Sequence, residues 1–258
     1  MASRIIGFLF ISITLISCGA TNKVAYFENV KDASFKSTLA TVEAPIQKND
    51  ILTISISSLN AEASAVFNPA SNAINKVATS SGSDVLAGGY LVSEDGNIQL
   101  PIIGTVTAAG LTKKQLKESI TNIILTKKLL IDPIVDIRYL NFEVTVIGEV
   151  GKPTVITVPS EKISLIKALG LAGDLTIYGR RDNVLLIREE NGQRITRHID
   201  LNSSEFLNSP YYYLQPNDVI YVEPNKTKVA SSSRSQQVVP IILSSLSIIV
   251  VVVTSLIK

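Results

Sequence analysis

An uncharged, apolar segment near the end of the chain is long enough to cross a membrane. Residues 238–257 carry no acidic or basic side chain, and as an α-helix this segment would extend about 30 Å, the thickness of a bilayer core. Residues 248–253 are all β-branched, a composition that favours strands in water. In lipid, however, a helix is the form in which one segment satisfies all its own backbone groups. The sequence therefore predicts a transmembrane helix over 238–257.

Hydroxyl side chains follow one face of this predicted helix. Ser244, Ser247, Thr254 and Ser255 recur with the 3.6-residue period of an α-helix. Such a face fits a packing seam, because small polar residues let helices approach closely in lipid. It also fits the wall of a water-filled pore, which requires a ring of such helices. A monomeric tail anchor is the third alternative, and the segment alone leaves all three open.

The start of the chain has the features of a lipoprotein signal. After Arg4, the uncharged run 5–16 is shorter than the roughly 20 residues that span a bilayer and is typical of a secretory signal. The run is followed by Ser-Cys-Gly, which resembles the end of the bacterial lipobox and contains the single cysteine, Cys18. We expect residues 1–17 to be a signal peptide and Cys18 to carry the lipid. The alternative is an ordinary signal peptide that contains a chance cysteine.

The remaining residues have the composition of a water-exposed body. Charged residues make up 18% of the whole chain, against about 25% in a typical soluble domain, and the two terminal segments account for much of the deficit. A hydrophobic content of 46% excludes disorder of the whole chain. The net charge of +2 gives no electrostatic case for a nucleic-acid partner.

A polar tether over 18–45 is expected to lead into a first α+β unit over 46–140. Alternation of apolar and polar residues predicts a strand over 51–57. The stretch 58–83 is rich in Ala, Ser and Asn and has little periodicity. It predicts a long loop.

The rest of the first unit is expected to contain a hairpin, a helix and a strand. Residues 90–92 and 98–103 are predicted to pair around an Asp-Gly dipeptide, which is favoured in tight turns. Thr112 begins a capping-box pattern that is followed by apolar residues at helical spacing, so an amphipathic helix of about 15 residues is expected there. Residues 134–139 predict the next strand.

A second unit is expected over 141–225, followed by a linker over 226–237. Period-two alternation and turn residues predict five strands and one short helix in this unit. The strands are expected at 142–147, 154–158, 183–188, 194–200 and 219–222, and the helix at 164–169. This order, in which a hairpin is followed by a helix and then by further strands, is that of a β-grasp domain.

Two motifs resemble a known family. Residues 90–104 read Y-L-V-S-E-D-G-N-I-Q-L-P-I-I-G and are followed at 109–112 by A-G-L-T. This resembles the polysaccharide export domain of Wza-type outer-membrane lipoproteins. Residues 146–150 read V-I-G-E-V and residues 215–222 read Q-P-N-D-V-I-Y-V, which is similar to a soluble-ligand-binding β-grasp (SLBB) module. The motif positions are Tyr90, Gly96, Pro101, Gly104, Gly110, Gly148, Pro153, Gly173 and Asp218.

The resemblance implies a fold and a function. It implies a small polysaccharide-export α+β domain, one β-grasp domain and a C-terminal transmembrane helix. Members of this family form rings, octameric in the best-known case, whose helices make a barrel through the outer membrane. The polymer, a capsular or exopolysaccharide, leaves through the lumen, which favours the pore-lining interpretation of the hydroxyl face. The implied partner is an inner-membrane polysaccharide co-polymerase, often fused to or paired with a tyrosine kinase.

The chain also departs from the family pattern. Pro153 is followed by Thr154 where a Pro-Gly dipeptide is usual. Longer members carry two β-grasp modules, whereas this chain has room for one. The alternative function is a non-channel envelope lipoprotein that binds glycan through its β-grasp domain.

No catalytic constellation, cofactor site or metal site is expected. His198 stands alone in a predicted strand, and the pair Glu94 and Asp95 is attributed to turn chemistry rather than to a metal. The run Tyr211–Tyr213 could stack on sugar rings, but strand or subunit-interface aromatics are the favoured interpretation. Residues 180–182, Arg-Arg-Asp, predict a solvated or inter-subunit charged corner. We therefore expect a transporter rather than an enzyme.

Overall fold

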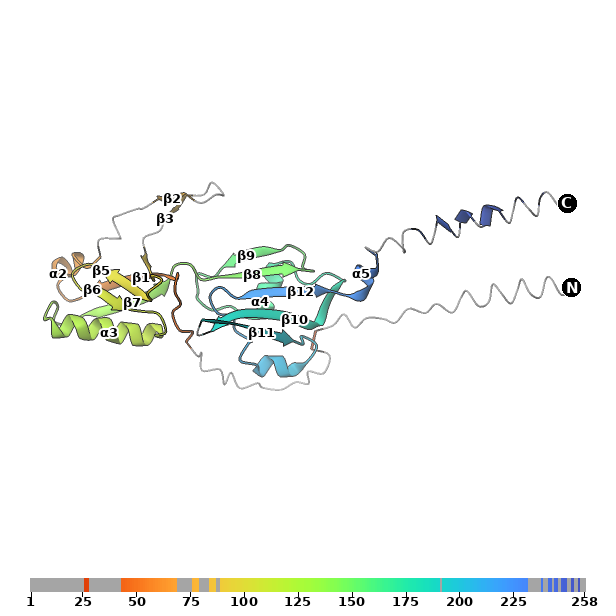
Figure 1. Cartoon of the computed structure of the whole chain (residues 1–258). Coiled ribbons are helices and arrows are strands. Elements are labelled where there is room, and N and C mark those ends of the chain that lie inside the picture. Colours follow the sequence, from red (N-terminus) through yellow and green to blue (C-terminus); the bar gives the residue numbers. More distant parts are fainter. Residues whose placement is uncertain are drawn as a thin grey trace.

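The computed structural model describes two central units and parts of the segments that flank them. The described residues are 26–27, 43–68, 76–78, 84–86, 89–190, 192–231 and scattered positions between 238 and 255. The two units lie end to end (Figure 1). Both combine sheets with helices, which confirms the α+β class.

The first unit is built on a three-stranded antiparallel sheet in the order β4-β1-β7. The central strand is β1 (Ile51–Ser57), and β7 (Ile134–Tyr139) pairs with six of its residues from Leu52 onward. The short strand β4 (Tyr90–Leu91) pairs with the beginning of β1. Along β1, buried residues alternate with more exposed ones, as the period of a half-buried strand requires.

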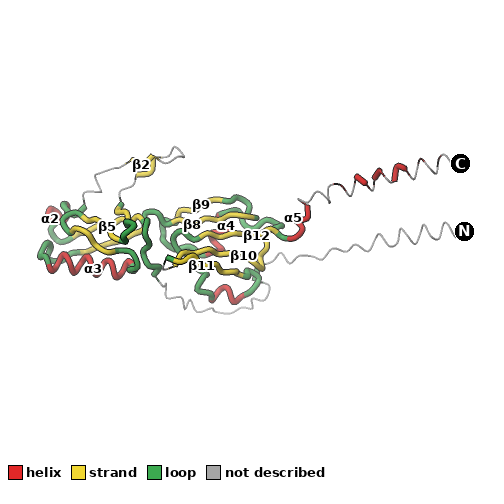
Figure 2. The backbone as a smooth tube through the Cα atoms, in the orientation of Figure 1, coloured by secondary structure: helices red, strands yellow, loops and turns green. Residues whose placement is uncertain are grey.

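The helix α3 (Lys113–Thr126) packs against β7 and runs along one side of the first unit (Figure 2). At its start, the Thr112 hydroxyl accepts a hydrogen bond from the Gln115 N–H at 3.2 Å, and the Gln115 side chain accepts one from the Thr112 N–H at 2.8 Å. Leu116, Ile120 and Ile124 are fully buried in the core of the unit. The predicted capping box and amphipathic helix are confirmed.

The predicted hairpin between 90–92 and 98–103 is wrong in its pairing. The Asp-Gly turn does form, because Ser93 accepts a hydrogen bond from Gly96 N at 2.8 Å. Beyond that turn, β5 (Asn97–Leu100) pairs with β6 (Gly104–Thr107) instead of with β4. The reason lies at Val92, whose N–H donates to the Asp50 carbonyl at 2.8 Å. This bond keeps the chain at β1 and directs the next segment into a separate two-stranded sheet.

The stretch 58–83 is not wholly a loop. It contains the helix α2 (Ala61–Ala65), capped by the Asn60 side chain, which accepts from Ala63 N at 3.1 Å. Asn68 then holds the chain to the end of β1, accepting from Ile56 N at 2.9 Å and donating to Ile56 O at 2.7 Å. Further along, β2 (Lys76–Ala78) pairs with β3 (Asp84–Leu86). Side-chain caps and side-chain-to-backbone hydrogen bonds hold the first part of this segment in place. Hydrophobic periodicity does not detect such interactions, so these elements were not predicted from the sequence.

The second unit contains a five-stranded sheet in the order β11-β10-β12-β8-β9. Its last strand, β12, lies at the centre, parallel to β8 and antiparallel to β10. The strands are β8 (Glu143–Gly148), β9 (Thr154–Thr157), β10 (Gly179–Glu190), β11 (Gln193–Ile199) and β12 (Val219–Pro224). All five were predicted, with β10 starting four residues earlier than expected. The assignment of this unit as a β-grasp domain stays a prediction.

The core of the second unit lies between this sheet and α4 (Leu165–Leu171). Ser164 caps the helix by accepting from Lys167 N at 3.2 Å, and Leu165, Ala168 and Leu169 are buried. A 3-10 helix (Ser204–Asn208) contributes Phe206 to the same core. This helix lies between β11 and β12 and leads into the tyrosine run.

The flanking segments are described only in part. Within the predicted tether, Tyr26 and Phe27 pack on the second unit, where Phe27 N donates to Leu201 O at 3.3 Å. The short helix α5 (Lys226–Ser231) follows β12. Among the described residues, no helix is both long enough and apolar enough to span a bilayer. The scattered described positions of 238–255 are helical. The predicted signal peptide and Cys18 lie outside the described residues.

Candidate functional site

Two turns with the same sequence pattern lie near the junction between the units. Residues 47–50 precede β1 and residues 215–218 precede β12, and both read Gln-X-Asn-Asp. In each turn the Asn adopts a left-handed conformation, with φ of 68° at Asn49 and 66° at Asn217. In each, the Asp carboxylate accepts a hydrogen bond from the Gln N–H at 2.7 Å. The same turn is therefore built twice, each time with a carboxyl group inside it.

The second of these turns contains a buried ion pair. Asp218 is fully buried and accepts two hydrogen bonds from the Arg188 guanidinium, at 2.8 and 2.7 Å. The Arg188 side chain is only 3% exposed and also donates to the Tyr213 carbonyl at 3.3 Å. Burial raises the pKa of Asp218, and the Arg188 guanidinium opposes that rise. The pair joins the turn to β10, the strand that pairs with β12.

The first turn contains a buried carboxyl group that forms no ion pair with any cation among the described residues. Asp50 is 1% exposed, and its Oδ1 has no hydrogen-bond partner among the described residues. Burial raises the pKa of Asp50 to about 6, against the opposing effects of the Gln47 N–H and the Asn217 side chain. Gln47 also reaches the second unit, donating from its side chain to the Glu189 carbonyl at 2.8 Å. The two turns therefore meet at the junction, and within the described part of the chain Asp218 has a compensating charge while Asp50 has none.

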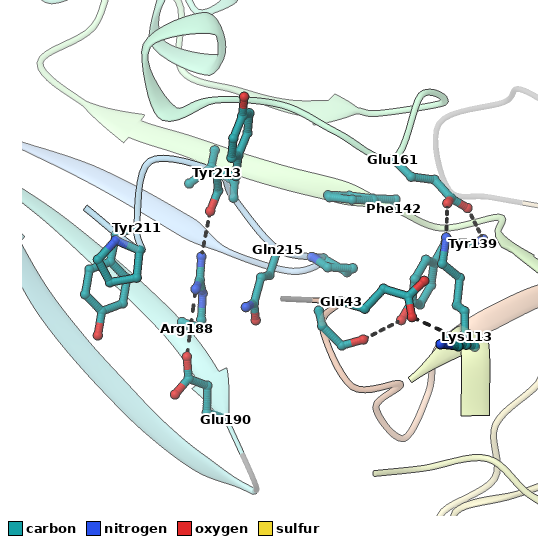
Figure 3. Close-up of a pocket in the computed structure, with 15 residues that line it drawn as sticks. Glu43, Lys113, Tyr139, Phe142, Glu161, Arg188, Glu190, Tyr211, Tyr213 and Gln215 are labelled. Atoms are coloured by element: carbon teal, nitrogen blue, oxygen red, sulfur yellow. Dashed lines mark hydrogen bonds and ion pairs between the residues drawn. The ribbon is translucent and has the colours of Figure 1, made fainter. Parts of the chain in front are cut away.

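A pocket of about 700 Å³ opens at this junction. The first unit contributes residues before β1, at the start of α3 and at the end of β7, and the second contributes β10 and the loop 210–216. Figure 3 shows Tyr211, Arg188 and Glu190 on one side, Glu43, Lys113, Tyr139 and Glu161 on the other, and Gln215 between them. The volume lies within the range of about 300–1,000 Å³ that small-molecule sites occupy.

One side of the pocket is held by an ion pair between the units. Lys113 of α3 pairs with Glu161 of the loop between β9 and α4, with side chains 22% and 17% exposed. Glu161 also accepts from Tyr139 N at 2.5 Å, and its own backbone is left-handed, with φ of 53°. Such a conformation costs energy in a non-glycine residue, and these two contacts hold it. Burial raises the pKa of the Tyr139 hydroxyl, and Asp50 and Glu161 add to the effect.

The other side of the pocket is formed by the tyrosine run. Tyr212 points into the core, where its ring centre lies 5.5 Å from that of Phe206. Tyr211 lines the pocket, with Arg188 5.6 Å from its ring centre and Arg197 donating to its hydroxyl at 2.8 Å. Lys162 lies 4.4 Å from the ring centre of Tyr213. The favoured sequence interpretation included a strand at this run, but the structure has no strand there. Tyr211 instead presents a fixed ring to the pocket.

The motif positions from the sequence lie mainly at turns. Gly96, Gly104, Gly110, Gly148 and Gly173 all have positive φ. At Gly148 the requirement is strongest, because a Cβ there would lie 2.2 Å from the Val222 carbonyl oxygen. Pro101 lies in the β5–β6 turn and Pro153 in the β8–β9 turn, while Tyr90 lies in β4. These positions shape the backbone, and Asp218 is the one that reaches the neighbourhood of the pocket.

The charged residues singled out in the sequence form hydrogen bonds or packing contacts within the fold. His198 is exposed on β11 and is hydrogen-bonded to Asn183 at 2.7 Å. Glu94 accepts from Asn49 at 3.1 Å. The predicted charged corner at 180–182 is wrong for Arg181, which is 8% exposed and lies 5.2 Å from the ring centre of Tyr26. Within the described ranges, no three His, Cys, Asp or Glu side chains are grouped to bind a metal ion.

The candidate pore-lining residues are described in part. Ser244, Ser247 and Ser255 are helical and exposed, and the Ser244 hydroxyl donates to the Ile241 carbonyl at 3.0 Å. Thr254 lies outside the described residues. These residues and the pocket belong to different parts of the chain.

Sequence reasoning missed most of the pocket. Its residues come from positions as distant as Glu43, Lys113 and Arg188, and no local pattern links them. One signal was available: the repeated Gln-X-Asn-Asp pattern before an apolar strand marks both turns at the junction. The glutamine and aspartate of that pattern are the residues that bond within each turn.

Comparisons with known proteins agree on one family. Residues 40–140 match the family described as polysaccharide biosynthesis/export protein. A protein of Ralstonia solanacearum, the EPS I polysaccharide export outer membrane protein EpsA, is 27% identical over 141 residues. Its counterpart in Ralstonia nicotianae is 29% identical over 139 residues. The matches cover 54% and 52% of this chain, and 37% and 35% of those relatives.

Proposed function

Since the chain is a polysaccharide biosynthesis/export family protein through residues 40–140, we propose that it exports a capsular or exopolysaccharide across the outer membrane. The observation that carries this proposal is the match of the first unit, which contains the motif 90–104, to that family. Two similar proteins are named as outer membrane exporters of EPS I polysaccharide. The family match and the two similar proteins each cover about half of the chain or less. The terminal segments lend further support to a role at the outer membrane.

We propose that the protein is anchored at both ends in the outer membrane. Cys18 follows a short signal-like run, and residues 238–257 are uncharged. Two or three acyl chains at Cys18 would give stable attachment, since each buried methylene contributes about 0.8 kcal/mol. The two units would then lie in the periplasm. The second unit is proposed to be an SLBB β-grasp domain, which its strand order supports by placing the last strand beside the first.

The export path is proposed to be a pore formed by a ring of these chains. The hydroxyl face of residues 244–255 would line the lumen, where weak hydrogen bonds allow a glycan to slide without being trapped. An inner-membrane co-polymerase, with or without a tyrosine kinase, would deliver the polymer. This partner and the number of subunits are proposed from the family resemblance.

Replacing both Ser247 and Thr254 with leucine should abolish export while leaving the ring intact. Leucine adds bulk and removes hydroxyls on the face proposed to line the lumen. The measurement is surface polysaccharide on cells that carry only the variant, together with electron microscopy of the purified protein in detergent. Ser245→Leu is the matched control, because at 100° per residue Ser245 lies on another face of the helix. Normal export by the double variant would show that this face does not line the lumen.

The same microscopy addresses the alternative function. A ring with a helical barrel supports the pore, whereas a monomer in detergent would favour a glycan-binding envelope lipoprotein that is merely anchored by its tail. The height of the ring would also report whether one β-grasp layer is present.

Replacing Cys18 with serine should prevent lipid attachment, because serine lacks the thiolate that the acyl-transfer reaction uses. Labelling with radioactive palmitate should fall to background, and the protein should be lost from the outer-membrane fraction or retain its signal peptide. A Ser17→Ala variant, which keeps a small residue before the cysteine, should label normally. Palmitate incorporation into the Cys18→Ser variant would contradict the lipid assignment.

A further inference from the structure

The junction pocket is lined by residues of the two central units, not by the segment 238–257 that we propose to form the pore, and its chemistry indicates a ligand. We propose that it binds a short, uncharged segment of saccharide, and that it does so with both units at once. This inference rests on the proposed export function, because the polymer in transit would supply the saccharide. It assigns to the pocket a binding role that is separate from the lumen.

The pocket combines an aromatic ring with hydrogen-bonding side chains. Tyr211 is partly exposed, and the contacts with Arg188 and Arg197 hold its ring in place. A sugar ring presents an apolar C–H face that packs on an aromatic ring, and equatorial hydroxyls that need donors and acceptors. Gln215 and Glu190 line the same pocket and offer both. Small-molecule sites typically combine an apolar wall with a few placed polar groups in this way.

The charged side chains that line the pocket favour a neutral ligand. The lining contains as many acidic as basic side chains: Glu43, Glu161 and Glu190 against Lys113, Lys114 and Arg188. Two of the cations are already paired, Lys113 with Glu161 and Arg188 with Asp218. A phosphate or uronate would therefore meet one exposed lysine and nearby carboxylates, which disfavours an anion. Six charged side chains also make the pocket unsuitable for a lipid tail. A neutral, hydroxyl-rich ligand fits both observations.

The pocket is lined by both units. Tyr211 and Gln215 belong to the second unit, whereas Glu43 and Tyr139 belong to the first. The Lys113–Glu161 ion pair already joins the two units, and a ligand that touches both sides of the pocket would add further contacts between them. Binding should therefore raise the thermal stability of the folded chain, because a ligand that binds only the folded state shifts the equilibrium toward it.

Saturation-transfer NMR on the full chain in detergent tests the proposal with three trisaccharides. Cellotriose and maltotriose are neutral probes, and trigalacturonate is the acidic probe. We expect saturation transfer to at least one neutral probe and none to trigalacturonate, together with an increase in melting temperature with that neutral probe. Transfer to trigalacturonate alone, or to no probe, would overturn the proposal.

Variants of Tyr211 locate the site. Tyr211→Ala should weaken binding about tenfold, the equivalent of about 1.4 kcal/mol, because it removes the ring. Tyr211→Phe keeps the ring and should bind nearly normally. Tyr178→Ala is the matched control, because Tyr178 also has a cation near its ring, Lys228 at 5.0 Å, but lies outside the pocket lining. Gln215→Met, of similar length, should weaken binding without removing the ring. Equal binding by the wild-type chain and the folded Tyr211→Ala variant would place the ligand elsewhere and contradict the proposal.

The outcome is distinguishable from a failure of the proposed function. Binding is measured on purified protein and does not depend on export. If cells lacking the protein fail to export polymer but no neutral probe binds, the pocket proposal is wrong and the export proposal stands. If a neutral probe binds at Tyr211 but cells lacking the protein export normally, the export proposal is wrong and the pocket proposal stands.

Discussion

Replacing Asp218 with asparagine should destabilise the second unit by about 3–5 kcal/mol, the usual effect of breaking a buried ion pair by removing one partner. The amide oxygen of the new side chain could still accept from the Gln215 N–H, but Arg188, only 3% exposed, would lose its buried, doubly hydrogen-bonded carboxylate and keep only Glu190, 3.8 Å away. The expected result is a large decrease in the denaturant midpoint of the full chain in detergent, with an unchanged m-value. Circular dichroism or tyrosine fluorescence provides the signal.

A double variant distinguishes lost pairing from lost packing. Arg188→Met combined with Asp218→Leu removes both charges and keeps apolar volume, so it should cost much less than the sum of the single changes. The turn would still lose the hydrogen bond from Gln215 N. If Asp218→Asn alone shifts stability by less than about 1 kcal/mol, the ion pair is not the element that holds this turn.

Replacing Asp50 with asparagine should have the opposite effect on the free energy of unfolding and stabilise the protein at pH 8. In the folded chain the pKa of Asp50 is raised from 3.8 to about 6. The folded state therefore binds the proton more tightly than the unfolded state between these two values. The contribution of Asp50 to stability is most favourable below about pH 4 and is lost as the pH rises toward about 6. At pH 8 the ionised group is buried without a cation, which is a cost on the order of 1–3 kcal/mol.

Asparagine removes that cost, since its side-chain oxygen can accept from Gln47 N without carrying a charge. Unfolding free energies measured from pH 4 to pH 8 should therefore fall less steeply with pH in the variant than in the wild-type chain. Glu94→Gln, an exposed change in the neighbouring turn, is the control and should leave the slope unaltered. Equal slopes for the wild-type and Asp50→Asn chains would contradict a raised pKa at Asp50. The two turns then form an internal comparison, because the same substitution has opposite effects where a cation is present and where it is absent.

Local features were predicted well from the sequence. The capping box at Thr112 and the spacing of Leu116, Ile120 and Ile124 led to the helix that the structure has, since caps and helical faces involve residues within a few positions of one another. Alternation identified β1 and β7 for the same reason. The sequence also marked the glycines whose backbones are left-handed, though it did not say what each turn joins.

Pairing partners were predicted less well. The Asp-Gly turn formed as expected, yet β4 pairs with β1 and β5 pairs with β6. The choice was made by the hydrogen bond between Val92 N and Asp50 O, residues far apart in the chain. A hairpin rule considers only the two strands that flank a turn, so it cannot include a competing edge brought from elsewhere.

The sequence by itself determined most of the elements outside 58–83 and the two uncharged segments, because period, capping and turn chemistry act over a few neighbouring residues. Only the tertiary structure decided that Asp218 meets Arg188 while Asp50 meets no cation among the residues that the structure describes, although each lies in a Gln-X-Asn-Asp turn. Burial and the identity of the facing side chain are set by packing between segments. For that reason the junction pocket, with Tyr211 on one side and Glu43 on the other, belongs to the fold and to no stretch of the sequence.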